Sequence, residues 1–293
     1  MAPVAVAAGP WTERRRRTAD MRRRHPFVGE LLDFYGALLA IQEDAFEDAR
    51  SASPSAGGLV SYVAEAVVPA VVDVSLAAGP VKLRDAVVRC LEITQPHDLV
   101  GAWVAGNNQD LVERYLARAS LGPVLEALGP EAASSCIGPR DKRHCPSCGG
   151  PPQLSFFAQA DEDLASGGRF LLCARCQAGW GYPRMTCPGC GEASSARLPI
   201  FNEEGTASGE RGSIVRGLQG RLVDREGGVE KKAVFPHIRI EACETCRQYL
   251  LNVDLAADPK AVPLVDELAA LPLDLYARDQ GFSKVTPNLL GFG

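Results

Sequence analysis

The sequence predicts an α+β protein with an all-helical N-terminal domain, two small β modules organised by metal, and a short C-terminal helical tail. Apolar residues recur at helical spacing through the first half of the chain. Four Cys-x-x-Cys pairs follow among short β-like segments. Aromatic residues make up only 6% of the chain, which favours packed small-residue helices over an aromatic-rich β-sandwich. At 293 residues the chain is long enough for about two domains.

Two regions are predicted before the cysteines begin. Residues 1–25 are rich in Ala, Pro and Arg, so we expect a basic, disordered leader with solvated charges. Residues 26–139 form the helical domain, and its first segment places these apolar residues at helical spacing: Phe27, Leu31, Phe34, Tyr35, Leu38 and Leu39. Further helices are expected between Gly, Pro and Asn breaks, at 59–76, 82–92, 97–105, 111–119 and 122–128.

The character of the sequence changes at residue 140, where cysteines appear and Gly and Pro rise. We expect a first metal module at 140–186 and a second at 187–257. Within the second, 203–230 is rich in Gly and Glu and is interpreted as a flexible insertion. Residues 258–293 form the tail, which returns to helix between prolines.

The four cysteine pairs are the strongest chemical signal. They are Cys145/Cys148, Cys173/Cys176, Cys187/Cys190 and Cys243/Cys246. A Cys-x-x-Cys turn directs two sulfurs to one ion, and two such turns complete a tetrahedral S4 site. Disulfides or redox-active dithiols are the alternative, but four pairs within about 100 residues favour metal. Eight ligands make two sites, and sequential, crossed and nested pairing of the turns all remain open.

The donor set limits the metal and its chemistry. All-thiolate ligation suits zinc or a single rubredoxin-type iron, and ligand identity alone does not choose between them. A site closed by four thiolates keeps no water position for hydrolysis, and no nucleotide-binding or hydrolase motif is present. We therefore expect no enzyme activity. Cys90 is predicted to be a core residue of a helix, and the role of Cys136 is left open.

Charge and composition limit the partners. A net charge of -5 and a pI near 5.5 argue against nucleic acid as the main partner. The most apolar stretch, 59–76, is interrupted by Glu65, Pro69 and Asp73, so no stable membrane insertion is expected. The N-terminal arginines are not followed by an apolar signal segment, and a cytoplasmic location is therefore expected. Three residues between the second and third cysteine pairs are candidates for client contact: Trp180, Tyr182 and Arg184.

With these residues in view, the chain resembles the formate dehydrogenase accessory protein FdhE family. The resemblance lies in the four cysteine turns with their flanks, at 145–152, 169–176, 187–191 and 240–250, and in the tail from 261 to 291. The helical half resembles the family less specifically, and the insertion is longer than the family pattern needs.

The resemblance implies a helical domain followed by two rubredoxin-like (zinc-ribbon-like) modules that bind iron. It also implies a cytoplasmic accessory or assembly factor, required for active respiratory formate dehydrogenase, that binds the catalytic subunit before export. Two other functions stay open: a rubredoxin-like electron carrier or redox sensor, and a nucleic-acid-binding zinc-ribbon protein. The acidic metal region and its lack of interleaved basic and aromatic residues weigh against the last.

Overall fold

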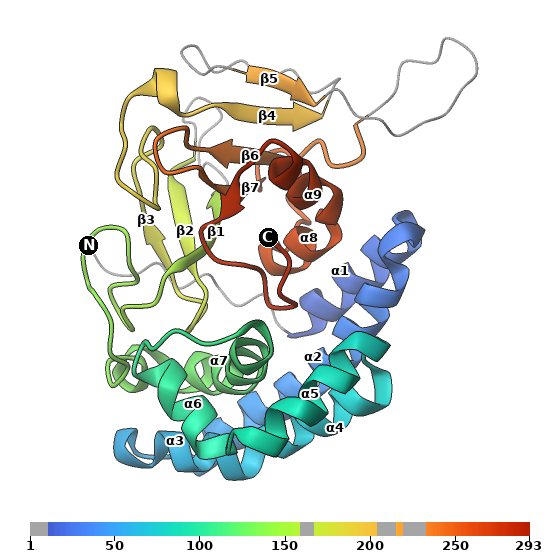
Figure 1. Cartoon of the computed structure of the whole chain (residues 1–293), viewed down its shortest axis with the longest axis vertical. Coiled ribbons are helices and arrows are strands. Elements are labelled where there is room, and N and C mark those ends of the chain that lie inside the picture. The colour runs from blue at the N-terminus through green and yellow to red at the C-terminus, as the bar shows by residue number, and fades with distance from the viewer. Residues whose placement is uncertain (1–10, 159–166, 204–214, 219–232) are drawn as a thin grey trace.

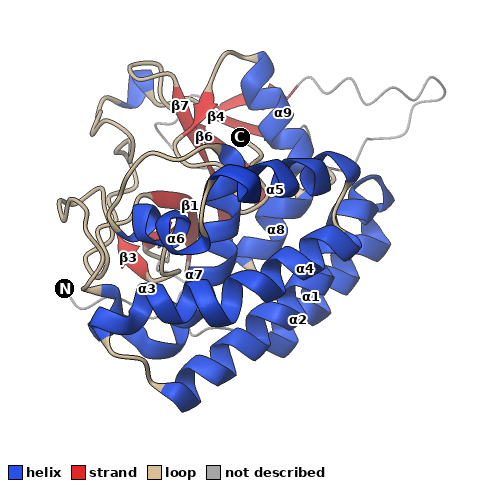
Figure 2. Ribbon diagram, turned by 60° about the horizontal axis from the view of Figure 1, so that its bottom comes forward, coloured by secondary structure: helices blue, strands red, loops and turns tan. Residues whose placement is uncertain are grey.

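A computed structural model describes residues 11–158, 167–203, 215–218 and 233–293. The helices of the N-terminal half gather at one end of the molecule and the strands at the other (Figure 1). The helices of the N-terminal half are α1 (Trp11–Arg24), α2 (Gly29–Ala52), α3 (Leu59–Tyr62), α4 (Val68–Ala78), α5 (Val81–Ile93), α6 (Pro96–Val104) and α7 (Leu111–Ala133). Figure 2 shows these helices packed along one another as a layer in front of the sheet. The predicted fold class is confirmed.

Helix α7 is one of the elements of the helical domain that contact the cysteine region. It starts with a capping box, in which the Asp110 carboxylate accepts hydrogen bonds from the N–H groups of Val112 and Glu113, each at 2.9 Å. The helix continues through Gly122 and Pro123, where the sequence had indicated a break. Twelve of its residues are buried, so packing outweighs the weak local propensity of this Gly-Pro pair.

Helix α1 corrects the expectation of a disordered leader. Residues 11–24 are helical, and Arg14 and Arg17 are buried rather than solvated. Both arginines bind carboxylates far away in the sequence, Arg14 to Glu126 and Arg17 to Asp266. These long-range ion pairs cannot be read from a local charge run, which is why the sequence suggested solvent exposure. Residues 1–10 lie outside the described part of the chain.

The strands form one sheet that includes both cysteine modules. They are β1 (Pro152–Phe157), β2 (Arg169–Cys173), β3 (Gly179–Gly181), β4 (Ile200–Glu203), β5 (Val215–Leu218), β6 (Ile238–Ala242), β7 (Gln248–Asp254) and β8 (Ser283–Lys284). Their order is β3-β2-β1-β7-β6-β4-β5, with β8 pairing β7 beside this path. Strands β1 and β7 run parallel, with Ser155 opposite Asn252. The two modules are therefore joined edge to edge. Most of the expected insertion 203–230 lies outside the described residues.

The tail packs against this sheet through two short helices, α8 (Pro263–Ala269) and α9 (Leu271–Asp279), which lie beside β6 and β7 in Figure 1. Its buried polar residues are tied to the sheet, since Lys284 lies between Glu267 (2.7 Å) and Asp274 (3.0 Å). One continuous apolar core runs from the helical domain through the sheet to these helices. The tail is thus part of the core.

One helical stretch, Ala56–Ala78, is long and apolar enough to cross a membrane by length and composition alone. In the structure, 39% of its most apolar window is buried, and the buried face contacts α2 and α7. Glu65 and Asp73 lie on its exposed face. Core helices of globular proteins meet the same length and composition criterion, so this stretch is weak evidence for a membrane span.

Candidate metal centres

The four Cys-x-x-Cys turns share one backbone conformation. In each, the N–H of the first cysteine donates to the carbonyl five residues later, as from Cys145 to Gly150 at 2.9 Å and from Cys187 to Glu192 at 2.8 Å. The fourth residue after the first cysteine has a positive φ in every turn: Gly149 (70°), Gln177 (59°), Gly191 (86°) and Arg247 (57°). Sequence reasoning found this conformation only where glycine supplies it. The repeat is therefore more regular in structure than in sequence.

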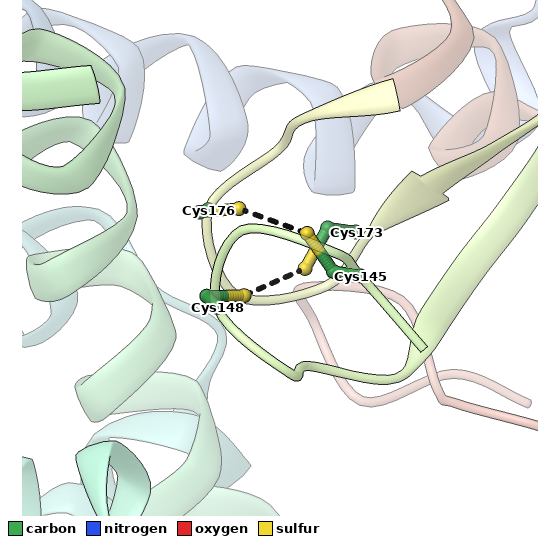
Figure 3. Close-up of side chains that lie close together, drawn as sticks. All are labelled: Cys145, Cys148, Cys173 and Cys176. Carbon is green, nitrogen blue, oxygen red and sulfur yellow. Dashed lines mark hydrogen bonds between the residues drawn. The ribbon is translucent and has the colours of Figure 1, made fainter. Parts of the chain in front are cut away.

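The structure brings the turns together in sequential pairs. Sulfurs of Cys145, Cys148, Cys173 and Cys176 form one cluster, and those of Cys187, Cys190, Cys243 and Cys246 form another, with all atoms in each cluster within 4.8 Å of one another. Figure 3 shows the first cluster, in which side chains from two facing loops point toward a common centre. Of the pairings that the sequence left open, the structure has the sequential one.

The spacing of the sulfurs fits a tetrahedral cation site. The Sγ atoms of Cys145 and Cys176 are 3.6 Å apart, and those of Cys148 and Cys173 are 3.3 Å apart. In the second cluster, the corresponding distances are both 3.7 Å. Four sulfurs at about 2.3 Å from a zinc ion lie about 3.8 Å apart, whereas a disulfide joins sulfurs at about 2.05 Å. These distances therefore match metal ligation and not disulfides.

The electrostatics of the clusters favour thiolates only when a cation lies among them. Burial raises the pKa of the Cys173 thiol well above its ordinary value, and hydrogen bonds with the neighbouring cysteine sulfurs raise it further. Four thiolates this close repel one another unless a cation lies among them. Backbone amides assist, since the N–H groups of Gly150 and Arg175 donate to Cys148 and Cys173, each at 3.3 Å. Each cluster can therefore bind a metal ion, and the donor set admits zinc or iron.

The two clusters differ in burial. All four cysteines of the first are buried, and they belong to the main core. In the second, Cys190 is exposed and Cys246 is partly exposed. Only a small separate group of apolar contacts surrounds the second cluster, formed by Cys187, Leu198 and Cys243 with Cys246 at its edge. A metal in the first cluster would be shielded from solvent, whereas one in the second would lie at the surface.

Two buried arginines connect the first cluster to the helical domain. Arg118 of α7 donates to the carbonyl of Ala174, inside the second turn, at 3.1 Å. Arg175, from the same turn, donates to the carbonyls of Ile137 (3.0 Å) and Cys148 (2.9 Å) and stacks on Trp103 of α6. Neither guanidinium has a carboxylate within salt-bridge distance in the described ranges. Their positive charges would therefore offset part of the net negative charge of a site in which four thiolates bind a divalent cation.

The candidate client-contact residues are mostly internal, which corrects that expectation. Trp180 and Tyr182 are each only 7% exposed. Trp180 donates its indole N–H to the carbonyl of Lys142, and Tyr182 donates its hydroxyl to the carbonyl of Cys187, each at 3.1 Å. They pack beneath the metal loops and connect the two modules. Arg184 is partly exposed and stacks over the ring of Phe157.

A third group of potential ligands was not found from the sequence. His237, Asp258 and Asp266 converge within 4.8 Å, but the Arg17 guanidinium from α1 already lies among them. The group is thus an ion-pair cluster that fixes α1 to α8. The two remaining cysteines, Cys90 and Cys136, are buried outside both clusters; the position of Cys90 in α5 is that expected of a core residue.

The fold and the two sites together define a class of protein: a helical domain joined to a sheet that carries paired tetracysteine knuckles. Residues 144–184 match the family model of the FdhE central domain, and residues 217–290 match that of the FdhE C-terminal domain. The resemblance of this chain to the FdhE family is therefore confirmed over these two segments.

Individual FdhE proteins are also similar to this chain. An FdhE homologue of Aquifex aeolicus is 31% identical over 151 residues, which are 52% of this chain and 42% of that protein. One of Pseudomonas aeruginosa is 31% identical over 146 residues, 50% of this chain and 38% of that protein. The matches thus span less than half of these relatives. The crystal structure of the FdhE protein from P. aeruginosa shares the fold with a TM-score of 0.61 at 21% identity, over 99% of each chain.

Proposed function

We propose that this chain is a cytoplasmic accessory factor required for the formation of active respiratory formate dehydrogenase, whose catalytic subunit it binds before export. The observation that carries the proposal is the pair of FdhE domain matches, which include three of the four cysteine turns. The turn of Cys187 and Cys190 lies between the two matched segments. We further propose that the eight clustered cysteines are the metal ligands and that the protein has no catalytic activity of its own. Iron is our choice of metal, on the family resemblance alone.

The closed donor sets support an accessory role over hydrolysis. Each cluster supplies four thiol ligands to one position, and such a site has no place for a reactive water. When bound, the metal would fix the two loops of each pair, while the backbone amides at the turns hold the sulfurs in place. Metal loading would then determine the shape of the exposed second site, where Cys190 reaches solvent. We propose this rim as part of the surface that contacts the client.

A genetic test with a capture assay addresses the proposal directly. Deleting the gene should abolish respiratory formate dehydrogenase activity while the catalytic subunit is still synthesised, and the wild-type gene should restore it. Cys190→Ser should weaken capture of the subunit, whereas Cys90→Ser, which changes a cysteine outside both clusters, should not. Circular dichroism checks that both variants keep their helices. Full enzyme activity in the deletion strain would refute the accessory role.

The exposed second site also favours one alternative, a rubredoxin-like electron carrier or redox sensor. Electron transfer requires a metal near the surface, and Cys190 provides such a position. Voltammetry of the iron-loaded protein separates the two functions. A reversible couple that is lost in Cys190→Ser, together with unchanged client capture, would favour the carrier. A protein with no reversible couple excludes it.

A further inference from the structure

The third cysteine turn, which carries Cys187 and Cys190, is held by a side chain from the first metal module. Arg143, which precedes Cys145 by two positions, donates through Nη1 to the carbonyl of Gly189 at 2.9 Å. Gly189 lies between the two cysteines of the third turn, and its N–H donates to the sulfur of Cys187 at 3.3 Å. The first module therefore contacts the loop that supplies half of the second site.

The Arg143 contact has no substitute at this carbonyl. Among the described residues, no other group donates to the Gly189 oxygen. The Cys187 carbonyl, by contrast, accepts from the Tyr182 hydroxyl at 3.1 Å and from the Gly191 N–H at 2.9 Å. Loss of Arg143 would therefore release the Gly189 peptide from the first module, whereas the Cys187 carbonyl would keep a partner if Tyr182 were changed.

The segment that leads into the first site sets the direction of the Arg143 side chain. The Asp141 carboxylate accepts from Arg143 twice, from the backbone N–H at 2.8 Å and from Nη2 at 3.2 Å. It also lies 2.7 Å from Nδ1 of His144. His144 is followed directly by Cys145, whose N–H donates to the carbonyl of Gly150 across the first turn. The segment 141–144 is thus attached to a cysteine whose position a bound metal would fix.

We propose that Arg143 is a positioning residue through which metal in the first site strengthens metal binding at the second. A metal bound by Cys145 fixes the segment 141–144 and directs the guanidinium onto Gly189. The third turn is then ordered before the second ion arrives, so less ordering remains to be done on binding. Coupling between two binding sites is reciprocal, so the second ion strengthens binding of the first by the same factor.

The test uses the full chain loaded with zinc, and the metal content is measured first. The proposal rests on metal binding at both clusters, so fewer than two zinc equivalents would overturn this premise and the coupling with it. Release to a chelator, followed with a metal-sensitive dye, should give a fast phase from the exposed second site and a slow phase from the buried first site. Two equivalents with unaltered release kinetics in the variants below would leave metal binding intact and overturn the coupling alone.

Arg143→Met should accelerate the fast phase by roughly threefold to tenfold, because the third turn loses a charged donor while all eight cysteines remain. The slow phase should not change, since the second site is already empty when the first releases its metal. Arg143→Lys, which keeps a cationic donor, should restore part of the wild-type rate. Lys142→Met is the matched control, because it removes the same charge from the exposed neighbouring position, and it should leave both phases unchanged.

Two further variants test whether the coupling begins at the first site. Cys148→Ser removes a cysteine of the first cluster, and its remaining zinc equivalent should leave as fast as the fast phase of Arg143→Met. Asp141→Ala frees the Arg143 side chain without changing any cysteine, and it should accelerate the fast phase by itself but add little to Arg143→Met. Circular dichroism checks that each variant keeps its helices. Additive effects of Asp141→Ala and Arg143→Met, or release from folded Cys148→Ser as slow as the wild-type fast phase, would show that the two sites are independent.

Discussion

Arg118 of the helical domain donates its Nε hydrogen to the carbonyl of Ala174, a residue between two cysteines of the first metal cluster. Arg175, from the same turn, donates to the carbonyl of Ile137 and stacks on the ring of Trp103. The metal site and the helical domain therefore share hydrogen bonds, and disturbing either should affect the other.

Arg175→Met should destabilise the protein by about 2 to 4 kcal/mol, because it leaves the buried carbonyl of Cys148 and the carbonyl of Ile137 without their charged donor. Urea unfolding of the metal-loaded protein measures the change. The matched control is Arg89→Met on the exposed face of α5, for which we expect a change within about 0.5 kcal/mol. Similar losses for both variants would contradict a specific role for Arg175.

Metal should leave the two clusters at different rates. A chelator reaches the second site first, because Cys190 is exposed whereas all four cysteines of the first site are buried. Release followed with a metal-sensitive dye should be biphasic, and Cys190→Ser should remove the fast phase alone. Loss of the slowly released metal from the first site should also increase hydrogen exchange in α6 and α7. Arg175 and Arg118 connect the first site to these two helices. A single release phase would contradict the difference between the sites.

Two glycines with positive φ offer a matched comparison. A Cβ on Gly149 would lie 2.7 Å from the backbone of Gly138, whereas a Cβ on Gly191 would meet nothing within 4 Å. Gly191→Ala should therefore cost only the conformational penalty, about 1 kcal/mol. Gly149→Ala should cost more and weaken metal binding at the first site, because two backbone segments must separate. Thermal melting and metal competition measure both effects, and equal losses would count against the close approach.

The ion pair between Arg17 and Asp266 should hold α1 on α8. Arg17→Met should cost about 3 to 5 kcal/mol, because it leaves the fully buried Asp266 carboxylate without its cation. In an Asp266→Asn background the same change should cost much less, so a double-mutant cycle isolates the pair. Arg16→Met, at an exposed position of α1, is the control. Additive effects of the two substitutions would show that the pair contributes nothing.

His25 should make stability depend on pH. Burial lowers its pKa below the ordinary value of 6.5, and the charges of Arg24 and Arg17 lower it further, so the folded protein favours the neutral ring. A group with a depressed folded pKa contributes stability that is lost as pH falls below the unfolded value. The melting temperature should therefore drop between about pH 6.5 and 5. The His25→Phe variant should show a smaller drop in melting temperature over this pH range. Identical pH profiles of melting temperature for the wild type and the variant would refute the role of His25.

Local motifs explain why most of the site could be predicted. The eight clustered cysteines follow from short spacing rules, and the helical half follows from apolar periodicity. The pairing of the turns, the burial of Trp180 and the helical state of residues 11–24 could not be predicted, because each depends on distant partners. Arg17 and Asp266, which are 249 positions apart, carry no local sign of their contact. Gln177 and Arg247 take conformations typical of glycine because they occupy the same position of the Cys-x-x-Cys turn as Gly149 and Gly191.

The parallel pairing of β1 with β7 determines the order in which the chain can fold during synthesis. Strand β1 ends at Phe157, but its partner begins only at Gln248, so a nascent chain carries an unpaired sheet edge for about 90 residues of translation. A longer delay applies to α1, because Arg17 waits for Asp266, 249 positions later, to emerge from the ribosome. The first cysteine cluster is complete at Cys176, well before either partner exists. Capture of metal by that cluster can therefore precede closure of the core, and early loading would protect the exposed strand until the tail arrives.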